Sequence, residues 1–495
     1  MSARRRPGSG PGGPAAAGAQ RQPSDPPVRD DRADSAGGCL SRSARLLAVL
    51  LGCFALLAPL PGGTPSGNGR PADPARTPAS AAYTVELAGD SSGGQWSGRQ
   101  RVSFTHVSGD PLREVYLRLW GNAPGGCSAP AVTVTHLVGA TVDGLRDGCT
   151  TLRIALPEPL GPGERHTIGF DLTVRAPELA DASGRFGRHG AYSHFGNALP
   201  VLAVRDGAGW HLDPFTDTGE SFYTLAADFT VVLDHPAALK VPATGTATGT
   251  PGTAGRTVTT VTARKVRDFA WSAGPFDTVS HVSAGGVAIN VHSGAGIADA
   301  DARAMLATAV SGLDTHAHAF GAYPYAELDV VVDNDLWFSG MEYPGFVLNR
   351  VKTSALLHEI AHQWWYGIVG DDQYQQPWLD ESFAEYATEL ALGRDGSGCW
   401  KAVEWSTPQE SITNGMAYWD EHPDRYEDVV YLYGACALHD LRRTIGPDAM
   451  TRLLRDYVRT HRYGVSTTSA FKAAAQAATA EDLTPFWAAH RIGDG

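Results

Sequence analysis

The chain has few cationic side chains and no cluster of them. Its 495 residues include 40 lysines and arginines against 53 aspartates and glutamates, which gives a formal net charge of −13. No basic patch with interleaved aromatic residues occurs, and this argues against a nucleic-acid partner. A chain of this length has room for two or three domains with sizeable cores.

Cysteine is also scarce. Only six are present, and none of them forms a Cys-x-x-Cys pair, so the thiols do not predict a metal site of their own. Two of the six lie near the N-terminus. The other four permit two disulfides in an oxidising compartment, Cys127–Cys149 and Cys399–Cys436, although the sequence does not establish the pairing.

The N-terminal part lacks an apolar run of full membrane length. The run from Leu46 to Leu60 is 15 residues long and follows Arg42 and Arg45. It is short for a membrane span and suits a signal-peptide core, with the arginines on the cytoplasmic side. A buried core helix is the alternative, but Pro/Gly-rich sequence on both sides disfavours it. We therefore expect the remainder to be extracytoplasmic, either secreted or anchored in the cell membrane.

These patterns divide the N-terminal part into three segments. We expect a disordered leader over residues 1–43, because this segment is rich in Pro, Gly, Ser and Arg with almost no apolar content. A signal peptide or membrane anchor is expected over 44–60. Residues 61–82 are typical of a flexible Pro/Gly-rich linker.

Apolar and polar residues then alternate through segments such as REVYLRLWG, HTIGFDLTV and DFTVVLD, which Gly, Pro and Asp turns separate. This pattern predicts an N-terminal antiparallel β domain over 83–283. Helical periodicity begins near Asp299 and dominates the rest. The expected fold class is α+β and multidomain, with no internal repeat.

The stretch ALLHEIAHQWWYG contains a His-Glu-x-x-His pentad. His358 and His362 are four positions apart, so on a helix they lie on one face and can reach one zinc. Glu359 lies beside them and can act on the attacking water without binding the metal. Two histidines that only cap a helix or form hydrogen bonds are the alternative. A catalytic zinc needs a third protein ligand.

Candidates for the third ligand follow in QPWLDESFAEYATELAL, which reads as a loop entering a helix with Asp380 or Ser382 near its start. Glu381 lies in this helix, and so do Glu385 and Glu389. A solvated carboxylate at a helix N-terminus is the alternative role for such residues. Residue type alone does not separate the three glutamates.

The spacing resembles that of the aminopeptidase N-type (gluzincin) family of zinc metallopeptidases. In that family 18 residues separate the pentad from a glutamate ligand within Trp-Leu-Asn-Glu-Gly-Phe-Ala. This chain has 18 residues between His362 and Glu381, within Trp-Leu-Asp-Glu-Ser-Phe-Ala. Asp380 and Ser382 depart from the family pattern, and the ligand is retained. Thermolysin-type enzymes have one more intervening residue and match less well. The resemblance implies one Zn2+ per chain, held by His358, His362 and Glu381.

Two further motifs carry the same resemblance. Gly340, Met341 and Glu342 resemble the family's Gly-x-Met-Glu-Asn segment, in which the glutamate binds the free α-amine of a peptide. Tyr343 stands where the family has asparagine, which puts the local strand geometry in question. A glutamate at a strand edge is the structural alternative for Glu342.

The segment Tyr431-Leu432-Tyr433-Gly434 resembles the family's Tyr-x-Lys-Gly. The resemblance makes Tyr431 the donor to the oxyanion of the tetrahedral intermediate. Tyr433, at the lysine position, is a competitor for this role. A buried core aromatic is the alternative for either tyrosine.

The resemblance also implies a domain plan. A thermolysin-like, mainly helical zinc-peptidase domain is expected over 284–440, followed by a short C-terminal helical extension over 441–495. Only 49 residues follow the RRTIG segment, so we expect a short bacterial-type member without the family's large C-terminal helical domain.

The implied function is a zinc-dependent aminopeptidase that hydrolyses N-terminal residues from peptides outside the cytoplasm. Glu359 is then the general base and Tyr431 the oxyanion donor, while Glu342 binds the amine together with Gly340 and Met341. Peptides are the expected partners, with a membrane tether through residues 44–60. A zinc endopeptidase with the same site is the nearest alternative. A non-catalytic, membrane-tethered peptide-binding protein is the other, although loss of Glu359 or of a ligand would mark it and neither is lost.

Overall fold

The computed structural model describes residues 75–180, 182–402 and 404–494, which belong to one compact unit. The predicted leader, the predicted signal peptide or anchor and most of the predicted linker lie outside the described residues. Within them, no helix is both long and apolar enough to cross a membrane.

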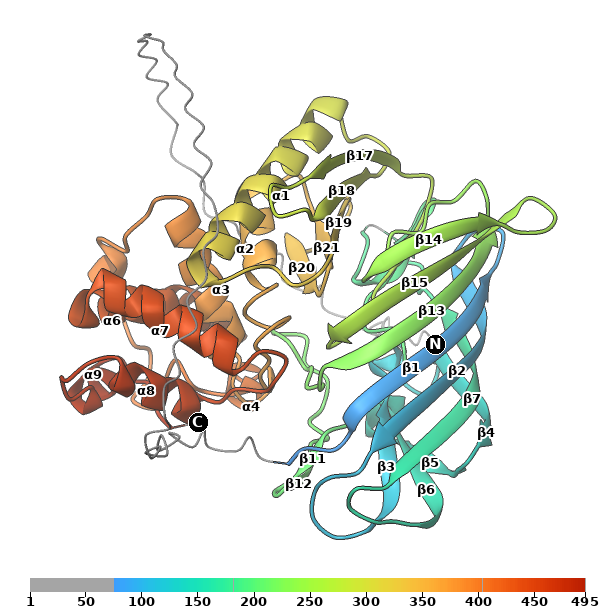
Figure 1. Ribbon diagram of the computed structural model, residues 1–495, viewed down its shortest axis with the longest axis horizontal. Helices are drawn as coiled ribbons and strands as arrows, with labels where there is room; N and C mark the ends of the chain where they lie inside the picture. Colours follow the sequence, from blue (N-terminus) through green and yellow to red (C-terminus); the bar gives the residue numbers. More distant parts are fainter. Residues whose placement is uncertain (1–74, 181, 403, 495) are drawn as a thin grey trace, which may run out of the picture. The chain divides into compact units, whose positions relative to one another are not determined.

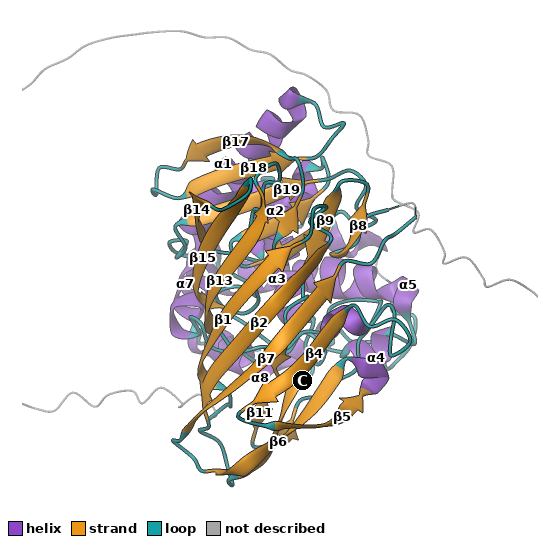
Figure 2. Cartoon of the chain, turned by 90° about the vertical axis from the view of Figure 1, so that its right-hand side faces the viewer, coloured by secondary structure: helices purple, strands orange, loops and turns teal. Residues whose placement is uncertain are grey.

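A seven-stranded sheet forms most of the N-terminal part, with strand order β14-β15-β13-β1-β2-β7-β4 (Figure 2). Buried and half-buried residues alternate without a break along β13, as expected for a sheet with one face on a core. The strands are β1 (Ala79–Gly89), β2 (Gln95–Thr105), β4 (Val132–Val138), β7 (Arg165–Arg175), β13 (Ala227–Pro236), β14 (Thr246–Pro251) and β15 (Arg256–Val266).

This sheet is antiparallel except at one pair. β1 runs parallel to β13, with Tyr83 beside Phe229, although more than a hundred residues separate the two strands in the sequence. The predicted antiparallel character therefore holds for every strand pair of this sheet except this one. Alternation specifies a strand and its buried face, but it does not specify which distant strand lies alongside.

Smaller sheets complete the β domain. A four-stranded sheet has the order β10-β3-β6-β5, a three-stranded sheet the order β16-β9-β8, and β11 pairs with β12. Trp96, Phe195 and Trp271 form an aromatic cluster in the core, with ring centroids 4.6 to 6.2 Å apart: Phe195 stacks on Trp271, and Trp96 meets both rings edge to face. The strands are β3 (Leu112–Arg118), β5 (Thr141–Arg146), β6 (Thr151–Leu160), β8 (Phe186–His189), β9 (Tyr192–Phe195), β10 (Val201–Leu202), β11 (Arg205–Asp206), β12 (Gly209–Trp210) and β16 (Ser272–Ala273).

A five-stranded sheet with order β17-β18-β19-β21-β20 opens the helical part. β18 and β19 are parallel neighbours, and the 22-residue helix α1 (Asp299–Phe320) crosses between them, as a parallel pair requires. The helix begins where the periodicity predicted it. β20 forms the sheet edge and carries Glu342. The strands are β17 (Asp277–Val282), β18 (Ala288–Ser293), β19 (Glu327–Val332), β20 (Gly340–Tyr343) and β21 (Phe346–Asn349).

Helices make up most of the remainder (Figure 1). α7 illustrates why they form: its buried residues recur at the spacing of one helix face, namely Met450, Leu453, Leu454, Tyr457 and Val458. The helices are α2 (Thr353–Ala361), α3 (Trp378–Ala391), α4 (Met416–Trp419), α5 (Pro423–Tyr426), α6 (Gly434–Ile445), α7 (Pro447–Thr460), α8 (Thr468–Ala477) and α9 (Thr484–Ala489), with short 3-10 turns η1 (Trp120–Asn122), η2 (Asp147–Cys149) and η3 (Cys399–Ala402) and a π-helix η4 (Glu427–Tyr433).

Both expected disulfides are present. Cys127 is bonded to Cys149 in the β domain, and Cys399 is bonded to Cys436 at the start of α6. The second bond ties the segment after α3 to α6. The domain limits predicted from the sequence remain predictions.

Candidate active site

The two histidines of the His-Glu-x-x-His pentad lie at the end of α2. His358 is in the last helical turn, and His362 follows the helix as its C-terminal cap. The apolar residues Leu356 and Ile360 are fully buried, which directs the two imidazoles to the opposite side of the helix. Their Nε2 atoms are 3.0 Å apart.

Glu381 brings the third ligand from the first turn of α3. Its Oε2 atom lies 3.1 Å from His358 Nε2 and 3.3 Å from His362 Nε2. Ligand atoms about 2.0–2.1 Å from a tetrahedral zinc lie roughly 3.3–3.4 Å from one another, so this triangle has the size of a zinc site. Two imidazoles and one carboxylate are also a donor set that zinc prefers. The three predicted ligands therefore fit the ion.

The outer nitrogens of both rings are held by hydrogen bonds. His358 Nδ1 lies 3.2 Å from Glu385 Oε2, and His362 Nδ1 lies 3.0 Å from the carbonyl oxygen of Trp365. Each acceptor favours a proton on Nδ1, so the Nε2 lone pairs face the metal position. Glu385 thus orients a ligand and Glu389 pairs with Arg394, which leaves Glu381 as the glutamate at the metal position.

The two departures from the family pattern around Glu381 have structural explanations. Asp380 is buried and accepts hydrogen bonds from Gln373 Nε2 at 2.7 Å and from the Glu381 backbone nitrogen at 2.8 Å. The Ser382 hydroxyl donates to the carbonyl oxygen of Val430 at 2.5 Å and so links α3 to η4. Both substitutions support the position of Glu381.

Glu359 lies beside the triangle, on the side of β20. Its side chain is buried, and Gly340 lies against it: a Cβ at Gly340 would be 2.3 Å from Glu359 Oε1, so this position requires glycine. Burial raises the pKa of Glu359 to about 8, with the His358 ring opposing this effect and Glu342 adding to it. A carboxyl that titrates near neutrality is suited to proton transfer.

Glu342 extends from β20 toward the same space. Oxygens of Glu342 and Glu359 and a nitrogen of His362 lie within 4.8 Å of one another. Burial raises the pKa of Glu342 to about 7, and the carboxylate of Glu220 adds to this. Met341 points to the other face of the strand and packs in a small apolar cluster, so any contact it makes with a substrate comes from its backbone.

Tyr343 does not distort the strand. β20 pairs regularly with β21, and the Tyr343 hydroxyl donates to Asn197 Oδ1 at 2.9 Å. Gly196 makes room for it, since a Cβ there would lie 1.9 Å from that hydroxyl. Gln363 then binds the Tyr343 carbonyl oxygen and the Gly345 nitrogen at 3.0 and 2.8 Å, which fixes β20 relative to the end of α2.

Tyr431 faces the metal position from η4. Its ring stacks on that of His358 at 5.7 Å, with 12° between the planes. Burial and the Glu381 carboxylate raise its pKa, so the hydroxyl keeps its proton. Tyr433 packs instead against Trp400 and Trp405, with ring centroids 5.9 and 5.3 Å away. Because π-helical turns occur often at functional sites, the irregular helix is a further sign that Tyr431 is placed for function.

Known proteins are similar to this chain. Residues 306–490 match the model of the peptidase family M1 domain. Aminopeptidase N of Streptomyces lividans is 25% identical over 219 residues, which are 37% of this chain and 25% of that protein. Residues 306–490 are therefore similar to a family M1 peptidase domain. Human endoplasmic reticulum aminopeptidase 1 is 27% identical over 222 residues, 38% of this chain and 23% of that protein. The matched segment thus spans about a quarter of these relatives.

A solved structure is similar to a larger part of the chain than these sequence relatives are. The M1 zinc metallopeptidase of Deinococcus radiodurans has a TM-score of 0.60 at 20% identity, and the match covers 84% of this chain and 92% of that one. The α+β fold, with a β domain before the helical part, is therefore confirmed. The similarity to the M1 domain, together with the donor set of His358, His362 and Glu381, indicates zinc as the metal.

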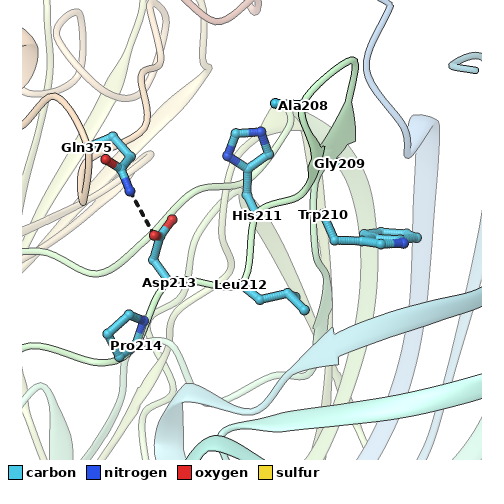
Figure 3. A pocket seen from close by; sticks show the side chains of 8 residues that line it. All are labelled: Ala208, Gly209, Trp210, His211, Leu212, Asp213, Pro214 and Gln375. Carbon is cyan, nitrogen blue, oxygen red and sulfur yellow. Dashed lines mark hydrogen bonds between the residues drawn. The ribbon is translucent and has the colours of Figure 1, made fainter.

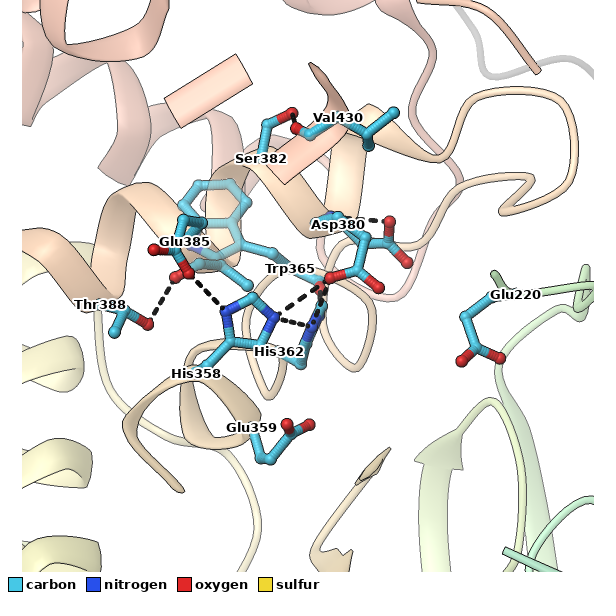
Figure 4. Close-up of polar contacts among 12 residues, drawn as sticks. Glu220, His358, Glu359, His362, Trp365, Asp380, Ser382, Glu385, Thr388 and Val430 are labelled. Atoms are coloured by element: carbon cyan, nitrogen blue, oxygen red, sulfur yellow. Dashed lines mark hydrogen bonds and ion pairs between the residues drawn. The ribbon is translucent and has the colours of Figure 1, made fainter. Parts of the chain in front are cut away.

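Sequence reasoning missed two residues of this site. Glu220 lies in the irregular stretch between β12 and β13 and faces the site (Figure 4). Arg185 holds it through two hydrogen bonds of 2.5 and 2.7 Å. No local motif marks either residue. Glu385 was a candidate ligand in the sequence, and the structure places it against His358 Nδ1 instead.

Removing the charge of Glu359 tests its role. Glu359→Gln should still bind about one zinc at the His358 site, because the three ligands remain, but it should lose at least about 10²-fold in kcat, as expected for a general base. Zinc content and single-turnover rates measure both effects. A chelator should abolish wild-type hydrolysis, and zinc should restore it. Wild-type rates in Glu359→Gln would show that the base is another residue.

A pair of conservative variants tests the oxyanion donor. Tyr431→Phe removes one hydroxyl and should lower kcat by roughly 10²–10³ with little change in KM, because the hydrogen bond forms mainly in the transition state. Tyr433→Phe is the control and should be close to wild type. The reverse result would move the role to Tyr433.

Proposed function

We propose that the protein is a zinc-dependent aminopeptidase that removes single residues from the N-termini of peptides. The observation that carries this proposal is the short distance between Glu342 and the metal-binding residues. In a peptide, the α-amine and the carbonyl carbon of the first residue are both bonded to the same Cα atom and are roughly 2.5 Å apart. A carboxylate this close to the metal position can bind the α-amine of the residue that is being cleaved.

Each residue of the site has its own role in hydrolysis. Bound zinc supplies Lewis acidity to the scissile carbonyl and lowers the pKa of the attacking water. Glu359 takes the proton from this water and passes it to the leaving amine. The Tyr431 hydroxyl donates to the oxyanion. Glu342 pairs with the α-ammonium, and the buried setting strengthens that contact because water competes less for it.

Two alternatives share parts of this site. An endopeptidase would use the same zinc residues but would not need a free amine. A binding protein would keep the ligands without turnover. The burial of Glu342, with Glu220 and Arg185 next to it, favours the aminopeptidase, since a buried carboxylate cluster is costly unless a cation binds there.

Matched peptides with free and acetylated N-termini distinguish exopeptidase from endopeptidase. We expect free peptides to be shortened one residue at a time while acetylated copies resist. Glu342→Ala should lower kcat/KM on free amines at least about tenfold, because a charge-assisted contact of roughly 1.5–3 kcal/mol is lost. Glu389→Ala, which removes a glutamate paired with Arg394 away from the site, should leave it unchanged. Equal cleavage of both peptides at internal bonds would favour the endopeptidase.

We further propose that the enzyme works outside the cytoplasm, secreted or tethered through residues 44–60. The apolar run behind two arginines supports this, and so do the two disulfides, which persist in oxidising compartments. Cell fractionation should find the full chain's activity outside the cytoplasm. Non-reducing peptide mapping of that material should link Cys127 to Cys149 and Cys399 to Cys436. Activity confined to the cytoplasm, with free thiols, would contradict the proposal.

A further inference from the structure

A second group of metal-binding side chains lies apart from the residues of the active site. One ligand atom from each of His211, Asp213 and Asp372 lies within 4.8 Å of the other two. His211 and Asp213 follow strand β12, whereas Asp372 lies in the loop between α2 and α3. The group borders a pocket of about 370 Å³ lined by Ala208 to Pro214 and Gln375 (Figure 3).

Polar contacts occupy the outer atoms of all three side chains: hydrogen bonds at the two aspartates, and an ion pair without a hydrogen bond at His211. Gln375 donates from Nε2 to Asp213 Oδ1 at 2.7 Å, and its backbone nitrogen donates to Asp372 Oδ1 at 3.2 Å. The Nε2 atom of His211 faces Asp206 Oδ2 at 3.0 Å. One nitrogen of His211 and one oxygen of each aspartate are thereby left to face one another. Figure 3 shows the second oxygen of Asp213 on the side of the His211 ring.

The distances fit a small divalent cation. His211 Nδ1 lies 3.3 Å from Asp372 Oδ2, which is about the separation of two ligands of a tetrahedral ion with bonds of roughly 2.0–2.1 Å. Asp206 lies next to the other ring nitrogen, Nε2, and carboxylates occupy this position beside many metal-binding histidines. We propose that His211, Asp213 and Asp372 bind a second divalent transition-metal ion of the zinc class, with water from the pocket completing its coordination.

The donor set favours this class of ion over calcium or magnesium. An imidazole nitrogen suits zinc and its neighbours, whereas calcium and magnesium select oxygen ligands alone. An ion here joins the segment after the β11–β12 hairpin to the loop that leads into α3. Glu381 lies nine positions after Asp372, so the site supports the loop that positions the third ligand of the catalytic zinc.

A proton on His211 competes with a metal ion for this site. The nearby carboxylates, Asp372 foremost, raise the pKa of His211 to about 9, against the effect of its burial. Asp213, Tyr223, Arg76 and Arg118 complete the charged and titratable surroundings. Arg118 donates to the carbonyl oxygen of Asp213 and stacks on Trp120. At neutral pH a metal ion must displace this proton, so binding is expected to release protons and to weaken as the pH falls.

Counting metal ions in the full-length chain tests the proposal without any activity assay. Metal-free protein is saturated with Zn²⁺, desalted and analysed for zinc. Wild type should hold two ions, whereas His211→Ala and the nearly isosteric Asp372→Asn should each hold one. His358→Ala should also hold one, at the second site. Asp206→Asn should hold two at saturation, with the second bound about tenfold or more weakly.

His136→Ala is the matched control, because His136 also pairs with an aspartate, Asp171 at 2.8 Å, but on an exposed surface. It should hold two ions. Zn²⁺ should raise the Tm of His358→Ala, because the second site remains. The double variant His358→Ala/Asp372→Asn should show no such rise in Tm. One ion in wild type, or two in both His211→Ala and Asp372→Asn, would overturn the second site. Two ions without peptide hydrolysis would overturn the proposed function alone.

Discussion

The contact of Glu381 with two imidazoles is the interaction on which the active site depends. It joins the end of α2 to the start of α3, at 3.1 and 3.3 Å. Such a buried cluster is stable only if its charges are matched and its outer atoms are bonded. Glu385 and the Trp365 carbonyl oxygen meet the second condition at the ring nitrogens. The orientation of the three ligands is therefore set before a metal binds.

The neighbouring elements are tied to this contact by single side chains. Gln363 links α2 to the β20–β21 hairpin, and Ser382 links α3 to η4. Glu342 and Tyr431 consequently approach the metal position from different elements. In the proposed function, the Glu342 carboxylate binds an amine and the Tyr431 hydroxyl donates to an oxyanion. Both groups must be held in place, because the reaction rate falls when reacting groups shift by about 1 Å.

The site is rich in carboxylates and poor in compensating cations. Glu220, Glu342 and Glu359 are all buried, and Arg185 neutralises the first of them. Burial and mutual repulsion raise the pKa values of Glu342 and Glu359 toward neutrality. In the proposed function, a bound metal and a substrate ammonium supply the missing positive charge. The same reasoning applies to the His211 group, where carboxylates from two distant segments meet around one imidazole.

Local sequence patterns determined much of this protein. The pitch of a helix places His358 and His362 on one side, and alternation identifies strands such as β13 and their buried faces. The spacing of Glu381 and of the Glu342 and Tyr431 motifs could be matched to a family, so these residues were predicted by number. Tertiary structure decided what no local pattern encodes. It set the parallel pairing of β1 with β13 and the approach of Glu220 and Arg185 to Glu342. It also set the stacking of Tyr431 on His358, with Tyr433 packed on Trp400 instead, and the contact of His211 with Asp372. These contacts join segments far apart in the chain, and they form only because the packing of whole sheets and helices brings those segments together.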